Sequence, residues 1–497
     1  MSKLNKDILF LIFEELQDDS KSLFSCLMVN RLWCETVIPI LWRNPWCYSN
    51  INYANKTYLF FIIACYLLDD IKEFITEQEI KLPSGSNQSL FFDYLSFCRS
   101  INVTTINSII SIGSSLTYNR FSMQQEFYFL FMKKCPELRY LDMGSIKHQI
   151  LCFPEAKVHL ESLYELRCDT SIDSLYFYGL SRSCHYIQKF IIDNINTKPN
   201  YGIVKLIEVQ KNLKHFEWED NFYEVHFKNG NPYDEIFLAL EKKAESLNYL
   251  KVFFLRVSNY EHTLFQKILP KFYKLKILII ESYFYFDGEQ IEKLKMQGYH
   301  ELEILNIGCN ELNLIPSIIK NSGGCLKKIL FNPYDSIDYK DDSFNEVSLK
   351  FIRNIYKNCP LIKYLSIAFP PSEEHFAEFE KLLKICQNLK SLLLIIYNMD
   401  EIKTEEMLKN GEILLKILIR SAPANLKEIR FGDDNLRFSL ENLEEFLEKW
   451  KGRHALTIFT MDSNFKRKDY TKLINKYESD GVIKYFKYFS HIDSLSY

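Results

Sequence analysis

The chain has 497 residues, of which 47% are hydrophobic and 25% are charged. It is too long for one ordinary globular core and too apolar to be disordered over most of its length, so it is multi-domain or a repeat array. The formal net charge of −3 offers no basic surplus for a phosphate backbone, which argues against nucleic-acid binding.

The amino-terminal segment Met1–Asp7 lacks the basic and apolar regions of a secretion signal. The most apolar run, Tyr58–Leu68, has 11 residues, and a membrane-spanning helix needs about 20. We expect this run to form a buried helix packed on the start of the array, and we expect no membrane partner. These features predict a cytoplasmic or nuclear protein with reduced thiols.

The first 46 residues predict a compact unit of three helices, which we call the hook. Ile8, Ile12 and Leu16, joined by Leu9 and Phe13, form an apolar stripe that wraps one helix. The stretch Asp18–Ser20 supplies an N-cap candidate for a second helix, whose stripe is Leu23, Cys26 and Leu27.

A third helix of the hook is expected through Leu32, Trp33 and Val37. Pro39 suits the first turn of a continuation that carries Leu41 and Trp42. Three short helices of this size bury little surface on their own, and their excess of apolar residues indicates a partner surface.

We expect residues 47–130 to form a helical connector that caps the following array, with one or two irregular early turns between Leu90 and Ile112.

Residues 131–497 carry an apolar triplet with the spacing 0, +3, +5, at intervals of 24 to 37 residues. The triplets begin at Leu138, Leu163, Ile187, Leu213, Leu247, Leu275, Leu302, Leu326, Ile362, Leu389, Leu426, Leu456 and Ile483, the last two being weaker copies.

This spacing is typical of leucine-rich repeats, in which each Leu-x-x-Leu-x-Leu segment forms one short strand. The +3 and +5 residues lie two apart, so in a strand both point inward. Cysteines precede the first anchor by three residues in four copies, which indicates small buried hydrophobes: Cys135, Cys184, Cys359 and Cys386.

Helical spacing returns between the anchors. Phe376, Phe379 and Leu382 mark one helix face after the start signal at Pro370–Ser372, and Glu441–Trp450 behaves similarly. A strand plus a helix per repeat predicts the α/β class, as a horseshoe-like solenoid with a curved parallel sheet. The longer intervals are expected to hold loops, such as Tyr334–Glu346.

No phosphate-binding glycine loop, nucleophile elbow, zinc-protease motif or Cys-x-x-Cys pair occurs in the sequence. We therefore expect no catalytic residue, no cofactor and no metal, and a chain that is not an enzyme.

The stretch Leu4–Trp46 resembles an F-box, and with the array behind it the chain resembles F-box proteins of the leucine-rich-repeat class. One departure is Asn5, where the family usually has proline. The residues that match the family pattern are Leu4, Asp7, Ile8, Ile12, Leu16, Leu23, Val29, Arg31, Trp33, Leu41 and Trp42.

This resemblance implies a substrate-recognition subunit of an SCF-type cullin–RING ubiquitin ligase. The F-box would dock the Skp-type adaptor and through it the cullin, and the array would bind an unknown target protein. The adaptor-binding residues implied by the resemblance are Leu4, Ile8, Ile12, Leu16, Val29, Trp33, Leu41 and Trp42.

Two alternatives stay open. The chain could be a leucine-rich-repeat interaction scaffold that acts outside ubiquitin transfer, and hook residues such as Ile12, Leu23 and Trp33 could simply form the hook's own core. On the strands, apolar residues at the +4 position are expected either to form a recognition patch or to be covered by a neighbouring loop: Ile279, Leu330 and Leu393.

Overall fold

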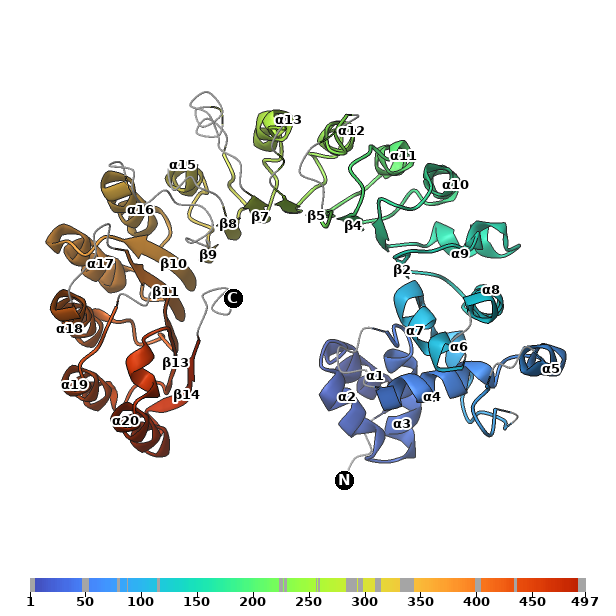
Figure 1. Ribbon diagram of the computed structural model, residues 1–497, viewed down its shortest axis with the longest axis horizontal. Coiled ribbons are helices and arrows are strands. Elements are labelled where there is room, and N and C mark those ends of the chain that lie inside the picture. Colours follow the sequence, from blue (N-terminus) through green and yellow to red (C-terminus); the bar gives the residue numbers. More distant parts are fainter. Residues whose placement is uncertain are drawn as a thin grey trace. The chain divides into compact units, whose positions relative to one another are not determined.

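The structure is a computed structural model, and it belongs to the α/β class, with strands and helices alternating along the chain (Figure 1). Every structural statement below concerns the residues that it describes: 5–46, 53–77, 81–86, 88–113, 117–222, 227, 230–255, 257, 260–282, 293, 298–308, 314–330, 344–397, 404–432 and 436–489.

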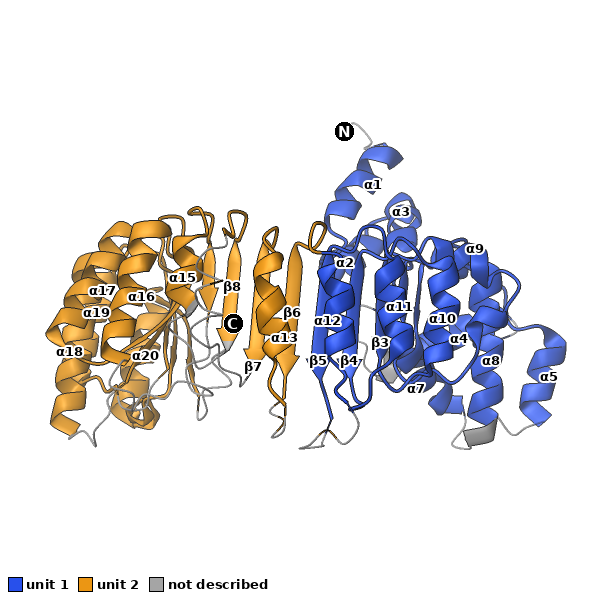
Figure 2. Ribbon diagram, turned by 90° about the horizontal axis from the view of Figure 1, so that it is seen from above, with its two compact units in different colours: residues 1–223, 228–243 blue, residues 224–227, 244–497 orange. Residues whose placement is uncertain are grey.

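The chain divides into two compact units, residues 1–223 with 228–243 and residues 224–227 with 244–497 (Figure 2). Unit 1 begins with the three hook helices α1 (Lys6–Glu15), α2 (Ser20–Leu27) and α3 (Arg31–Leu41), and both α1 and α2 pack on α3. The connector helices follow as α4 (Tyr53–Ala64), α5 (Asp69–Glu77), α6 (Tyr94–Phe97), α7 (Val103–Gly113) and α8 (Thr117–Lys134).

Unit 1 also holds the first five strands, which pair in sequence order and run parallel where pairing is described. These are β1 (Ser100–Asn102), β2 (Tyr140–Asp142), β3 (Glu165–Asp169), β4 (Lys189–Asn194) and β5 (His215–Asp220). Helices that follow the strands lie along one face of the sheet (Figure 1). They are η1 (Ile150–Cys152), α9 (Ala156–Glu161), α10 (Ser174–Ser183), α11 (Tyr201–Val209) and α12 (Asp234–Glu241).

Unit 2 repeats the same strand-and-helix arrangement. Its parallel strands are β6 (Tyr249–Phe254), β7 (Ile277–Ser282), β8 (Ile304–Gly308), β9 (Lys328–Leu330), β10 (Tyr364–Phe369), β11 (Ser391–Ile396), β12 (Glu428–Phe431), β13 (Leu456–Thr460) and β14 (Ile483–Tyr488). Its helices are α13 (Thr263–Ile268), η2 (Leu269–Lys271), α15 (Leu314–Lys320), α16 (Phe344–Asn358), α17 (Glu373–Ile385), α18 (Thr404–Ser421), α19 (Leu440–Trp450), η3 (Ser463–Lys466) and α20 (Lys468–Ser479).

The predicted repeat sets the register of the sheet. The +3 residues of successive copies lie opposite one another, as Leu141 does with Leu166 and Leu365 with Leu392. These side chains and the first anchors are 1% exposed or less in the eleven stronger copies. The four cysteines that precede an anchor are buried as predicted, and the Cys184 thiol donates to the Leu160 carbonyl at 3.3 Å. Stacked repeats thus form the continuous apolar core that no single repeat could make.

Several local predictions are also confirmed. Ser372 caps α17 by accepting the His375 amide, and Asp19 caps α2 by accepting the Ser22 amide at 3.1 Å. Helix α4 buries Phe60 and packs on α7, as expected for the most apolar run. The helix ends at Ala64, however, and Tyr58 and Leu68 at the two ends of the run are 68% and 63% exposed, so the expected buried helix is confirmed only in part.

No helix among the described residues is long and apolar enough to cross a membrane.

Other predictions were wrong in detail. The copy placed at Leu456 is out by one residue, because Ile458 and not Phe459 lies opposite Ile429 and points inward. Pro39 lies inside α3 and does not begin a new helix. Strand β1, by contrast, confirms that an early repeat turn lies between Leu90 and Ile112 in the connector segment. The predicted loop Tyr334–Glu346 is wrong at its end, because residues 344–346 form the start of α16, and its residues 334–343 lie outside the described residues.

Candidate docking site on the first three helices

Helix α1 carries two apolar faces. On one face Leu9 and Phe13 are each 1% exposed, and the Phe13 ring meets Trp33 of α3 edge-on at 5.2 Å between centroids. On the other face Ile8, Leu11 and Ile12 remain 49%, 62% and 45% exposed. Their spacing of three and four residues puts them on one side of the helix. Helix α1 therefore packs on α3 and still presents an apolar ridge to solvent.

A second exposed apolar group surrounds the turn between α2 and α3. Asn30 caps α3 by accepting the Trp33 amide at 3.0 Å, which fixes the turn. Leu23 is fully buried on the opposite side of α2. The exposed members of this group are Phe24, Met28, Val29 and Leu32, at 51%, 87%, 54% and 36%. Seven large apolar side chains thus stay exposed on a unit of three short helices, and such a concentration marks an interaction site.

The predicted adaptor-binding residues divide into four sets, one of which is the buried pair Leu41 and Trp42. Ile8, Ile12 and Val29 lie in the two exposed groups, and Leu16 and Trp33 are half-buried. Leu4 lies outside the described residues. Of the three residues for which the hook's own core was the alternative, Leu23 is fully buried, Trp33 is half-buried and Ile12 is 45% exposed, so the alternative holds for Leu23 and not for Ile12.

Leu41 and Trp42 require a correction, because they are 3% and 8% exposed and so present no surface to a partner in this structure. The Trp42 ring packs against Tyr94 of α6 with 4.7 Å between centroids. These two residues hold the hook against the connector.

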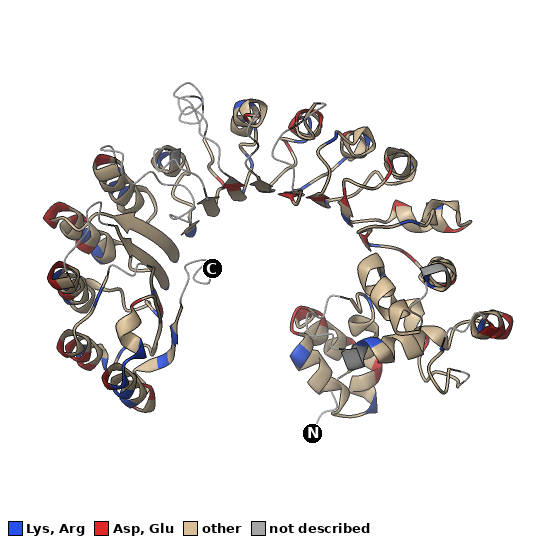
Figure 3. Ribbon diagram, viewed as in Figure 1, with Lys and Arg blue, Asp and Glu red and all other residues tan. Residues whose placement is uncertain are grey.

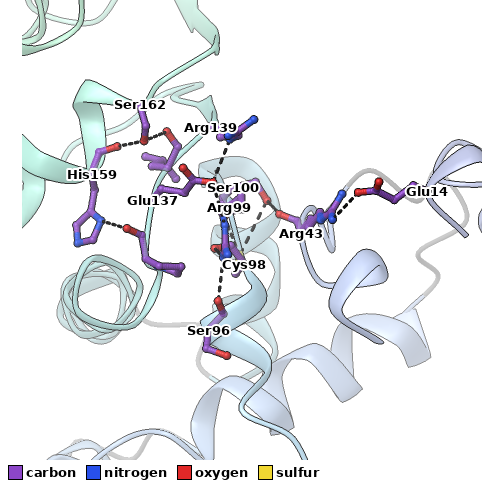
Figure 4. A network of polar contacts seen from close by, with 12 residues as sticks. Glu14, Arg43, Ser96, Cys98, Arg99, Ser100, Glu137, Arg139, His159 and Ser162 are labelled. Atoms are coloured by element: carbon purple, nitrogen blue, oxygen red, sulfur yellow. Dashed lines mark hydrogen bonds and ion pairs between the residues drawn. The ribbon is translucent and has the colours of Figure 1, made fainter. Parts of the chain in front are cut away.

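Polar contacts extend this attachment to the first repeat (Figure 4). The Arg43 carbonyl, just after α3, accepts hydrogen bonds from the Arg99 amide at 2.9 Å and the Ser100 hydroxyl at 3.1 Å. The Trp46 indole N–H donates to the Ser100 carbonyl at 3.0 Å, and its ring meets Phe131 of α8 edge-on at 5.6 Å. The end of the hook is therefore bonded directly to the start of β1.

Ion pairs flank these bonds. Glu14 of α1 accepts from Arg43 at 2.8 Å, and Glu137 lies 3.3 Å from Arg99 and 3.1 Å from Arg139 (Figure 4). Glu14 and Arg43 are both more than a third exposed, so the pair adds little stability. The ion pair instead fixes the position of α1 relative to the segment that leads into the array.

Four exposed residues of the site were missed by sequence reasoning: Leu11, Phe24, Met28 and Leu32. A signal did exist for two of them, because Phe24 and Met28 are four residues apart and so share one side of α2. That pair is distinct from the stripe of Leu23 and Leu27, which was taken for the whole apolar face.

The strands offer a second surface. Charged residues of both signs occur along β3 to β5 (Figure 3), and Arg167 pairs with Asp193 at 3.0 Å and Lys189 with Glu165 at 3.2 Å. On later strands Leu330 and Leu393 are buried, at 8% and 5%, so these two side chains do not form an exposed recognition patch. Ile279 is half-buried.

No group of three or more His, Cys, Asp or Glu side chains among the described residues could hold a metal ion. The docking site instead consists of apolar side chains held by capped helices. An exposed apolar surface of this kind is suited to contact with another protein.

Comparison with known proteins adds likenesses of fold. No protein-family model and no curated protein matches the chain. It is similar to a chain of a structure described as the Rad7 and Elc1 complex in yeast, with 14% identity over 74% of this chain and 92% of that chain and a TM-score of 0.37. A Bacteroides fragilis protein is also similar, with 14% identity over 61% and 67% and a TM-score of 0.26. Both TM-scores lie below 0.5, so neither likeness indicates a role for this chain.

Proposed function

We propose that this chain is a non-catalytic substrate receptor of an SCF-type cullin–RING ubiquitin ligase. The hook helices dock a Skp-type adaptor, which brings the cullin, and the repeat array holds a target protein. The observation that carries the proposal is the exposure of the apolar side chains on α1 and around the α2–α3 turn, led by Met28 at 87%.

The exposed apolar side chains can contribute binding energy when a partner covers them. Burying one large apolar side chain is worth roughly 1.5–3 kcal/mol. Ile8, Leu11 and Ile12 share one ridge, and a central apolar cluster of this kind supplies most of the binding energy in protein interfaces.

The firm attachment of the hook supports a receptor rather than a flexible tether. Its last residues are held by Trp42 on Tyr94 and by Trp46 on Ser100 and Phe131. A receptor accelerates ubiquitin transfer by raising the local concentration of target lysine near the charged enzyme, and a rigid link preserves that gain.

Co-purification of the full chain with a Skp-type adaptor tests this function. Ile12→Asp places a charge on the α1 ridge and should abolish the complex, because an unpaired carboxylate would be buried in an apolar contact. Leu175→Asp is the matched control, because Leu175 is 75% exposed on α10, away from the hook, and should leave the complex intact. An adaptor that fails to bind the unaltered chain would refute the ligase function and leave an interaction scaffold.

A further inference from the structure

A cavity of about 330 Å³ lies in unit 1, lined by residues of α7, of α8 and of the loop after β2. Cavities that hold small molecules start at roughly this size, near 300 Å³. Val103 and Tyr128 are each 1% exposed and give the cavity an apolar floor. The docking site described above makes no use of it.

One wall of the cavity is aromatic. The His148 ring is 6% exposed and stacks on Phe121, with 3.9 Å between centroids and 26° between planes. Tyr128 lies 5.4 Å from the same imidazole. Phe121 is 42% exposed, so its ring reaches the mouth of the cavity. This wall offers flat faces on which a planar ligand can stack.

Two successive side-chain hydrogen bonds fix the imidazole of His148. The Gln124 amide nitrogen donates to the Asn107 side-chain oxygen at 2.6 Å, which leaves the Gln124 oxygen to accept from His148 Nε2 at 3.0 Å. Burial lowers the pKa of His148, so the ring is neutral near pH 7. The imidazole is therefore a fixed support for the Phe121 ring and adds no charge.

The charge in the cavity comes from Arg120 of α8 and Lys147 of the loop after β2. No Asp or Glu stands among the described residues that line the cavity. A guanidinium presents a planar set of N–H donors that matches a carboxylate or phosphoryl group. Two permanent positive charges beside an aromatic wall favour an anion that carries a flat apolar body.

The loop that carries Lys147 and His148 is held in place by hydrogen bonds. The Ser145 amide donates to the Asp169 carboxylate at 2.7 Å, and the Gly144 amide donates to Asp142 at 3.1 Å. Ser145 has a φ of +58°, which is uncommon for a residue with a Cβ and is maintained here by its bond to Asp169. The loop is thus organised before any ligand arrives, which reduces the entropy cost of binding.

We propose that this cavity is a binding site for a small aromatic anion. Arg120 and Lys147 hold the anionic group, and the flat body packs on Phe121, whose ring is supported by His148. The site is independent of the proposed adaptor docking, because it uses none of the hook residues.

Calorimetric titration of the full chain with 2-naphthyl phosphate tests the site, with 2-naphthoate as the carboxylate arm. We expect one binding site, with inorganic phosphate and neutral 2-naphthol each at least tenfold weaker, because each lacks half of the recognised chemistry. Lys147→Gln should weaken 2-naphthyl phosphate at least fivefold, and its exposed position keeps the fold intact. Arg120→Gln should do the same where the melting temperature is unchanged.

Arg182→Gln is the matched control, because Arg182 is an exposed residue of α10 outside the cavity and should leave the affinity unchanged. Phe121→Ala should weaken 2-naphthyl phosphate and 2-naphthol alike. The proposal is overturned if 2-naphthyl phosphate does not bind, if 2-naphthol binds as tightly, or if Arg182→Gln weakens binding as much as Lys147→Gln.

Discussion

Replacing Met28 by alanine should weaken adaptor binding more than replacing Ile12, because the two side chains differ in the surface that they still have to bury. Met28 is 87% exposed and Ile12 is 45% exposed. Full burial of such a side chain is worth roughly 1.5–3 kcal/mol, so about 2 kcal/mol is available at Met28 and about 1 kcal/mol at Ile12. At 1.4 kcal/mol per tenfold change, Kd should rise about 30-fold for Met28→Ala and about fivefold for Ile12→Ala.

The assay is calorimetry with a purified Skp-type adaptor, beside thermal melting of each variant. Both side chains lose little intramolecular contact in these variants, so we expect nearly unchanged melting temperatures. Leu175→Ala, at a site 75% exposed on α10, should leave Kd unchanged. The reasoning fails if Ile12→Ala costs as much as Met28→Ala, since exposure would then not determine the contribution of each residue.

Three further predictions concern stability. Trp46→Phe should lower the free energy of unfolding by about 1 kcal/mol, because it removes the indole bond to the Ser100 carbonyl; urea denaturation measures this. Gly202→Ala should lower the free energy of unfolding by about 1–3 kcal/mol, because the added Cβ would lie 2.2 Å from the Ser174 carbonyl oxygen. Alanine by itself favours helices, so a raised melting temperature would contradict this packing argument. Burial lowers the pKa of His375 in the folded chain to about 4, compared with 6.5 in the unfolded chain. The stability that the neutral imidazole contributes to the fold is therefore present above pH 6.5 and is lost as pH falls toward 4. Between pH 7 and pH 5 the loss is at most about 2 kcal/mol, and hydrogen exchange in α17 should show it in the unaltered chain but not in His375→Gln.

The repeat could be predicted from sequence because its signal recurs. Leu141, Leu166 and Phe190 each follow a first anchor by three residues, and each lies opposite the next in the sheet. The prediction failed at β13 because both of its faces carry apolar side chains. Ile458 points inward, while Phe459 lies on the other face, where the Arg430 guanidinium stands 4.7 Å from its ring. When both alternating positions are apolar, the spacing rule loses its ability to choose between them.

In helix α1 of the hook, too, apolar residues on more than one face left the buried face ambiguous. Ile8 and Leu9, and again Ile12 and Phe13, are adjacent apolar pairs, so the stripe in the sequence wraps more than half of the helix. The half that is buried depends on where α3 lies, and the decisive contact of Phe13 with Trp33 joins residues 20 apart in the chain. The sequence predicted three helices and a partner surface, but it could not assign each residue to the partner or to the core.

The burial of Leu41 and Trp42 clarifies what the closing Leu-Trp pair does in this chain. A tryptophan exposed at the docking surface would leave the hook joined to the array only through residues 43–46. With Trp42 packed on Tyr94 and Trp46 bonded to Ser100, the hook instead becomes continuous with the first repeat turn. Buried contacts therefore connect the helices that carry the exposed ridge to β1, and buried contacts resist local opening better than solvent-exposed ones. In the proposed receptor, docking and attachment therefore use different residues of the hook, and Trp42→Ala should loosen the hook without removing its exposed apolar surface.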